Sequence, residues 1–394
     1  MASAGSATQA SWIAIGSLAV GAFALVTSEF LPVGLLPEIS RDIGATHGQT
    51  GLMVTLPGVL AAIAAPLSIH YARNMERRLV LLVLLGVLVA SNLIVAFATS
   101  FTHLMIGRGL LGVAIGGFWT IAGALGPRLR PGPQGVRASA VILGGVSLGT
   151  VAGLPAGALL GELLGWRYAF GASAILAGAA FGALLGLLPK VHPKPSTGFT
   201  DMMAILRGRD GRLRIFAASV MYAGTYAAYT YIAPFLSEKA AISGELLSGV
   251  LLASGIAGFF GNMAGGWLSG RDARRSVLVT ASLAIVSILL LPALGANPAI
   301  AILLVTVWGF SLGMQAISLM SWLQGSEPRR RDAMQALFVS LSQLAIGVGA
   351  LIGGLVVDSV GTSGAMIAGA LAAMVTLITV SYTPKPPTLL QPAE

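Results

Sequence analysis

Residues 76–97 read ERRLVLLVLLGVLVASNLIVAF, two arginines followed by nineteen residues without a charge. An uncharged apolar stretch of this length crosses the roughly 30 Å hydrocarbon core of a bilayer as one helix. Residues 273–294, displaced by 197 positions, read ARRSVLVTASLAIVSILLLPAL and repeat the basic turn and the apolar run. The two segments together predict a membrane protein that is built from an internal repeat.

The composition of the whole chain supports this prediction. Of 394 residues, 56% are hydrophobic and only 9% are charged, with a mean hydropathy of +0.87. A soluble domain carries about 25% charged residues, so this chain has too few charges to cover a water-facing surface. The absence of cysteine excludes disulfides and thiolate metal sites, and the four histidines lack metal-ligand spacing. We therefore expect an all-α membrane protein without a metal or an organic cofactor.

Twelve apolar stretches are long enough to span the membrane. They cover approximately residues 12–35, 49–69, 79–97, 103–125, 138–160, 168–188, 213–236, 246–268, 276–294, 298–323, 333–357 and 362–382. No cleavable signal peptide is expected, because the N-terminus lacks a basic region and the first stretch is too long.

The repeat divides these stretches into two groups of six. Gly112 and Gly116 in the fourth stretch correspond to Gly309 and Gly313 in the tenth, again 197 positions apart. Residues 190–212, which are rich in proline and basic residues, separate the groups. The sequence thus predicts a six-helix bundle over residues 1–189, a linker over 190–212 and a pseudo-symmetric second bundle over 213–394. In transporters built from such repeats the substrate site lies near the bilayer midplane between the bundles.

The basic residues indicate the orientation in the membrane. Nineteen of the 23 Lys and Arg residues fall on the side of both termini and three fall on the opposite side, Arg41, Arg167 and Lys239. The positive-inside rule then places both termini in the cytoplasm. The net charge of +9 follows from this topology, and we do not expect a nucleic-acid partner.

Two charged residues lie within the predicted spans. Glu29 is close to the end of the first stretch and Arg108 is close to the start of the fourth, so both lie within roughly 10 Å of the same membrane face. Charges at membrane depth are costly and commonly functional. The two could exchange a proton during transport, or form a static pair between helices, or Arg108 could extend to the interface without a further role.

Tyrosines mark a candidate substrate site. Tyr222, Tyr226 and Tyr229 share one helical face, and their hydroxyls need partners that a hydrated cavity supplies. Rings with hydroxyls suit flat or ring-shaped polar molecules, although packing between helices is an equally open role. Other candidates for the same site are Phe118, Trp119, Trp308, Gln315, Gln343 and Asn262.

The fifth stretch carries glycines at every fourth position, Gly149, Gly153, Gly157 and Gly161. They form a smooth stripe that lets helices approach closely, and Pro155 should kink the helix there. The stripe suits static packing or helices that slide between two states.

The chain lacks the motifs of enzymes and of nucleotide-driven pumps. It has no Gly-x-Ser-x-Gly, no His-Glu-x-x-His and no P-loop. We therefore predict that it is not an enzyme and that any pumping draws on an ion gradient.

Several motifs resemble the twelve-span drug:proton antiporter branch of the major facilitator superfamily. Residues 108–112, Arg-Gly-Leu-Leu-Gly, look like its fourth-span motif, in which the arginine is associated with proton transfer. Gly149-x-x-x-Gly153-Leu154-Pro155-x-Gly157 looks like its antiporter motif with one residue inserted before the proline. Residues 68–78 occupy the place of its cytoplasmic loop, although Ala72 and Met75 depart from that pattern. The resemblance implies a conformational role for Gly153, Pro155 and Gly157, for Arg77 and Arg78, and for Arg274 and Arg275.

Within that branch, residues 106–170 are similar to bacterial purine ribonucleoside efflux permeases. Residues 29–32 and 229–234 have related forms there and in sugar efflux transporters. The resemblance implies a monomer in a bacterial inner membrane that exports purine nucleosides or sugars by alternating access in exchange for protons, with Glu29 and Arg108 as coupling residues. A polyspecific drug exporter and an uncoupled facilitator of the same fold are the alternatives.

Overall fold

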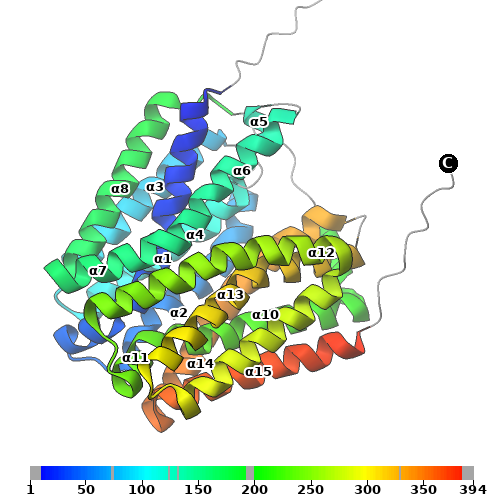
Figure 1. Cartoon of the computed structure of the whole chain (residues 1–394). Coiled ribbons are helices and arrows are strands. Elements are labelled where there is room, and N and C mark those ends of the chain that lie inside the picture. The colour runs from blue at the N-terminus through cyan, green and yellow to red at the C-terminus, as the bar shows by residue number, and fades with distance from the viewer. Residues whose placement is uncertain are drawn as a thin grey trace, which may run out of the picture.

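A computed structural model describes residues 10–71, 75–122, 125–130, 133–191, 199–327 and 330–383, and all regular structure in these ranges is helical (Figure 1). The first half contains α1 (Trp12–Ile43), α2 (His47–Tyr71), α3 (Arg77–Ala96), α4 (Phe101–Ala122), α5 (Gly126–Leu129), α6 (Pro133–Leu148), the π-helical turn η1 (Gly149–Gly153), α7 (Leu154–Leu164) and α8 (Trp166–Leu187). After it come α9 (Phe199–Arg207), α10 (Arg209–Tyr229), α11 (Ile232–Ala240), α12 (Gly244–Leu294), α13 (Pro298–Ser326), α14 (Arg331–Val360) and α15 (Thr362–Tyr382).

Ten helices within the described ranges are long and apolar enough to cross a membrane. One of them, α12, has 51 residues and contains both the eighth and the ninth predicted span, because Asp272 takes a non-helical conformation between them (φ −154°, ψ 98°). The seventh predicted span is less apolar and corresponds to α10 and α11, which are separated at Thr230 and Tyr231. All twelve predicted spans are therefore helical in the structure.

Equivalent glycines make equivalent contacts in the two halves. Gly116 of α4 lies against the backbone carbonyl of Ala61 in α2, and Gly313 of α13 lies against that of Gly258 in α12. Gly313 lies 197 positions after Gly116, and Gly258 lies 197 positions after Ala61. The second pair of glycines repeats it, Gly112 against Pro57 and Gly309 against Ser254. The repeat in the sequence thus reflects a repeat in packing.

The basic turns serve as helix anchors within each half. Arg78 donates to the carbonyl of Leu185 near the end of α8, and Arg274 donates to that of Val380 (3.1 Å) near the end of α15. Cations at helix C-termini satisfy carbonyls that lack an intrahelical partner. The neighbouring arginines bond nearby, Arg77 through its backbone N–H to Val191 and Arg275 through its guanidinium to Asp272.

Part of the predicted linker over residues 190–212 is helical. Residues 199–207 form α9, which an ion pair between Asp201 and Arg330 (3.3 Å) ties to the start of α14. Residues 192–198 lie outside the described ranges, as does Ala72 of the predicted cytoplasmic loop. The division of the chain at residues 189 and 213 stays a prediction.

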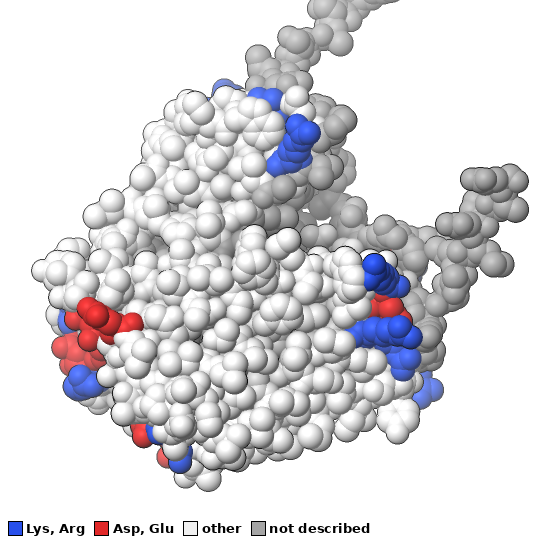
Figure 2. Space-filling view, in the orientation of Figure 1, with Lys and Arg blue, Asp and Glu red and all other residues white. Residues whose placement is uncertain are grey.

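The two halves meet along α2 and α14 and where α12 packs against η1 and α7. Away from that contact α6 and α12 diverge toward the end of the molecule that holds α5 (Figure 1). Figure 2 shows that charged side chains gather at the two ends and leave a broad uncharged band between them, as expected of a surface in contact with lipid.

Polar contacts close the opposite end, where α1 meets α2. The Asp358 carboxylate of α14 accepts hydrogen bonds from Thr46 Oγ1 (2.8 Å) and from the Gly48 backbone N–H (3.0 Å). His47 lies 3.9 Å from Glu238 of α11. Because Asp358 accepts an otherwise free N–H at the start of α2, it joins the two halves as a helix cap does.

The glycine contacts give a test of the packing. We expect Gly313→Ala to destabilise the protein by about 1–3 kcal/mol, since the added methyl group would overlap the Gly258 backbone. Gly266→Ala is the matched control: a methyl group there meets open space, and alanine favours a helix over glycine by about 1 kcal/mol. Thermal unfolding in detergent compares the two, and equal midpoints would contradict the proposed packing.

Candidate functional site

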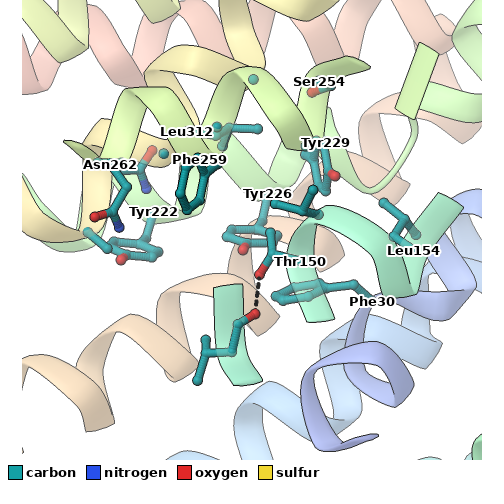
Figure 3. Close-up of a pocket in the computed structure, with 18 of the residues that line it drawn as sticks. Phe30, Thr150, Leu154, Tyr222, Tyr226, Tyr229, Ser254, Phe259, Asn262 and Leu312 are labelled. Atoms are coloured by element: carbon teal, nitrogen blue, oxygen red, sulfur yellow. Dashed lines mark hydrogen bonds between the residues drawn. The ribbon is translucent and has the colours of Figure 1, made fainter. Parts of the chain in front are cut away.

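A cavity of about 280 Å³ lies between the two halves. Residues of α1, α6, η1 and α7 line one side, and residues of α10, α12 and α13 line the other (Figure 3). Its lining is mostly apolar and includes Phe30, Val146, Thr150, Val151, Leu154, Tyr222, Tyr226, Tyr229, Ser254, Gly255, Gly258, Phe259, Asn262, Met263, Gly309, Leu312, Gly313, Gln315 and Ala316. A cavity between the bundles is where repeat-built transporters hold their substrates.

The three predicted tyrosines of α10 all line this cavity. The rings of Tyr222 and Tyr226 are nearly parallel, with centroids 6.4 Å apart, and Tyr226 also stacks on Phe30 from the other half at 5.6 Å. None of the three hydroxyls donates to another residue in the described parts of the chain. Their hydrogen-bonding capacity is available to a molecule in the cavity.

Two amides add polar groups to the cavity wall. Gln315 of α13 accepts a hydrogen bond from Thr225 Oγ1 (2.8 Å) through Oε1, which fixes the side chain and leaves its NH₂ group as a donor. Asn262 of α12 also lines the cavity and forms no hydrogen bond to any described residue. A few polar groups in an apolar cavity are the usual arrangement of a small-molecule site.

Four predicted substrate residues do not line the cavity. Phe118 is fully buried in the core of the first half, and Trp119 packs edge-to-face against it at 6.0 Å. Trp308 lies behind Tyr229, edge-to-face at 5.7 Å. Gln343 contacts Glu29 instead. An aromatic residue type does not by itself indicate a cavity, because most faces of a helix in a bundle contact other helices.

Several lining residues were not predicted. The sequence around them has no pattern of polar residues that distinguishes a cavity wall from a helix contact or a lipid-facing surface. These residues are Phe30, Thr150, Ser254, Phe259 and Leu312. Thr150 belongs to the π-helical turn η1, and such turns hold one extra residue and are frequent at functional sites. In the sequence, the one residue inserted before Pro155 relative to the antiporter motif could have indicated this turn.

The glycine stripe of the fifth span faces α1 in its own half. Gly153 lies against Thr27 and Gly157 lies against Leu31, with no room for a side chain at either glycine. Pro155 is buried beside them. The stripe is thus a packing surface inside the first half, whereas Val151 of η1 meets Gly255 of the second half.

Glu29 and Arg108, which the sequence places at a similar depth, lie close together in the structure, but no ion pair joins their side chains among the described residues. Both are buried, with 5% and 1% of their surface exposed. The Arg108 guanidinium donates to three backbone carbonyls, those of Met53 (2.6 Å), Ser28 (2.6 Å) and Glu29 itself (2.8 Å). The Glu29 carboxyl accepts instead from Gln343 Nε2 (3.3 Å), which belongs to the other half.

Prolines explain why these carbonyls are available. A helical carbonyl accepts from the N–H four residues later, and proline has no N–H. Pro32 therefore frees the carbonyl of Ser28, and Pro57 frees that of Met53. Arg108 supplies a donor to both. In a medium without water this removes the cost of two unsatisfied polar groups at once.

Comparisons with known proteins agree with this architecture. A family model described as Major Facilitator Superfamily matches residues 18–326. The chain is 34% identical over 378 residues to a protein of Pseudomonas aeruginosa named transcription regulatory protein OpdE, covering 94% of each chain. It is 32% identical over 372 residues to the purine ribonucleoside efflux pump NepI of Escherichia coli strain K12, again covering 94% of each.

Two solved structures share the fold. A bacterial homolog of the human lysosomal transporter Spinster matches with a TM-score of 0.72 and 16% identity, covering 96% of this chain and 97% of that one. The human organic anion transporter MFSD10 matches with a TM-score of 0.65 and 18% identity, covering 93% and 98%.

The proline and arginine contacts predict energetic coupling. Arg108→Ala should destabilise the protein strongly, because each unsatisfied carbonyl costs about 1–3 kcal/mol. Pro57→Ala restores an N–H that can bond to Met53, so the double variant should lose less stability than the two single variants together, by about 0.5–3 kcal/mol. Thermal unfolding of the four proteins measures this coupling.

Pro66→Ala provides the control for this cycle, since Pro66 lies in α2 but no carbonyl near it accepts from Arg108. Its effect should add to that of Arg108→Ala. Equal coupling for both prolines would rule out the proposed link.

Proposed function

Since the chain belongs to the Major Facilitator Superfamily, whose members are membrane transporters, we propose that it exports small polar ring compounds, purine nucleosides first, in exchange for protons. Sugars are the second class of substrate that we consider. The proposal places the protein in a bacterial inner membrane as a monomer with both termini in the cytoplasm.

The composition of the cavity wall carries this proposal. A purine presents a flat aromatic face together with ring-nitrogen and carbonyl acceptors. Tyr222 and Tyr226 offer aromatic faces, while Gln315 and Asn262 offer amide donors. The similarity to efflux pumps named for purine ribonucleosides, over 94% of both chains, supports the same class.

The volume of the cavity favours a small substrate over a polyspecific drug exporter. Small-molecule sites measure roughly 300–1,000 Å³, and this cavity of about 280 Å³ is at the small end of that range. No carboxylate is among its lining residues to attract a lipophilic cation. A single nucleoside or sugar suits these properties better.

Glu29 supports the proton coupling. It is a carboxyl group at membrane depth, directly before Phe30, which lines the cavity and stacks on Tyr226. A change of charge at Glu29 therefore takes place next to residues that contact the substrate. One proton that moves down a potential of 100 mV releases about 2.3 kcal/mol, and this sustains more than a tenfold concentration ratio of substrate.

The positive-inside rule relates the conformation of this structure to a step of the transport cycle. In the proposed orientation the end closed by Asp358 faces outward, and the end where α6 and α12 diverge faces the cytoplasm. A cavity that opens at that end receives substrate from the cytoplasm, as an exporter requires. Rocking of the two halves would open the outer end.

Counterflow into proteoliposomes tests the coupling. We expect labelled inosine to exchange through the wild-type protein and an imposed pH gradient to drive it uphill, whereas Glu29→Gln should keep the exchange and lose the gradient-driven accumulation. Arabinose and ethidium, tested in parallel, separate the sugar and drug alternatives. Exchange of inosine without any dependence on the pH gradient would support an uncoupled facilitator instead.

The amides give a second test. Asn262→Leu should raise the KM for inosine by about 2- to 12-fold, the loss of one hydrogen bond worth about 0.5–1.5 kcal/mol. Gln335→Leu, at an exposed position of α14 outside the cavity, should leave the KM unchanged. An unchanged KM in the Asn262 variant would remove this residue from the site.

A further inference from the structure

We infer that Gln343 of α14 is the positioning residue that makes closure of the α1–α2 end depend on protonation of Glu29. This inference rests on the proton coupling proposed above and names the group in the second half through which it acts. It assigns to Gln343 a role different from the substrate contact that the sequence suggested.

The carboxyl of Glu29 and the amide of Gln343 connect the two halves of the molecule. Gln343 Nε2 donates to Glu29 Oε1 at 3.3 Å, and both side chains are more than nine-tenths buried. The other polar atom of the amide, Gln343 Oε1, is buried and has no partner among the described residues. A buried acceptor without a donor is costly, so it indicates a missing hydrogen.

Protonation of Glu29 supplies that hydrogen. An ionised carboxylate can only accept, which leaves Gln343 Oε1 without a donor. A protonated carboxyl has one O–H, which can donate to Gln343 Oε1 while its other oxygen accepts from Nε2. The neutral pair then forms two reciprocal hydrogen bonds. The proton comes from the aqueous phase and returns to it, and no other bond forms or breaks.

The remaining neighbours of Glu29 do not compete for this role. The titratable groups that face it are Arg108 from α4 and Tyr226 from α10. Arg108 directs three N–H donors to the carbonyls of Ser28, Met53 and Glu29 and forms no hydrogen bond to the Glu29 carboxyl, and Tyr226 stacks on Phe30. The Glu29 side chain therefore has one hydrogen-bonding partner in the described structure, and that partner belongs to the other half.

The position of Gln343 on α14 explains how the pair influences the conformation. At this residue α14 packs against Gly58 of α2, and farther along the same helix Asp358 holds the start of α2. Separation of the halves at the closed end would break the pair. Protonation of Glu29 adds a hydrogen bond to the closed form alone, so the closed fraction should rise as the pH falls.

Distance measurements between spin labels can follow this closure. The chain has no cysteine, so labels at Thr99→Cys and Ala296→Cys, exposed positions in the α3–α4 and α12–α13 connections, report the closed end alone. In proteoliposomes without substrate, the wild-type protein should shift from a short to a longer distance as the pH rises. Glu29→Gln, which keeps a neutral donor and acceptor, should hold the short distance at every pH.

Gln343→Met tests the residue itself, because it keeps the length of the side chain and removes both polar atoms. We expect the distance to lose its pH dependence. Gln335→Met, the same change at an exposed position of the same helix, should respond like the wild type. Gln343→Asn, which withdraws the amide by one methylene, provides a second variant with the same expected loss if the methionine variant does not fold.

The outcomes separate this inference from the proposed function. A full pH response in either Gln343 variant, a Glu29→Gln protein that opens, or a wild-type distance that ignores pH would overturn it. If the pH response is present and inosine does not exchange, the substrate proposal fails and the role of Gln343 stands. If proton-driven inosine export is present and Gln343→Met responds to pH, the role of Gln343 fails alone.

Discussion

A buried guanidinium that donates to three backbone carbonyls is the constraint on which the centre of this molecule depends. Arg108 reaches from α4 to α1 and α2 at the points where Pro32 and Pro57 interrupt the hydrogen-bond ladders. In lipid neither the cation nor the freed carbonyls could remain without partners. The arginine requires the carbonyls that the prolines free, and these carbonyls require the arginine.

This arrangement also determines what Glu29 can do. Had Arg108 paired with the carboxylate, the two charges would have satisfied each other within one half of the molecule. The guanidinium instead donates to backbone carbonyls, and the Glu29 carboxyl accepts from the amide of Gln343 in the other half. Phe30 follows Glu29 and stacks on Tyr226, so the proposed proton site and substrate site share one short segment of α1. Coupling between two such sites is reciprocal.

The sequence contained the fold and part of the site. Apolar length located twelve helical spans, and the offset of 197 positions identified contacts that recur in both halves, as Gly116 and Gly313 show. Helix rise placed Glu29 and Arg108 at a similar membrane depth, and the structure shows that they are neighbours. The carbonyl partners of Arg108 were not predicted, because the opposite charges drew attention to an ion pair. The sequence feature that indicates them is the pair Pro32 and Pro57, each of which lies four residues after a carbonyl that it leaves without an N–H.

The direction of the side chains was the second feature that could not be predicted from the sequence. The tyrosines of α10 could be placed at a cavity because their hydroxyls require a polar environment, whereas Phe30 and Leu312 carry no such mark. Phe118 and Trp119 belong to the core of the first half and do not line the cavity. The structure thus adds mainly the information of which helix face lines the cavity and which face packs against other helices.

The π-helical turn η1 shows how such a face is set. Each residue of an α-helix turns the chain by about 100°, so one extra residue rotates the segment before it relative to the segment after it. After the turn, Gly157 packs on Leu31 of α1, while within it Thr150 and Val151 line the cavity. In a regular helix Thr150, seven residues before Gly157, would lie on nearly the same face as Gly157, because seven residues turn the chain by about 700°, close to two full turns. The inserted residue therefore lets one helix serve the packing of its own half and the cavity between the halves.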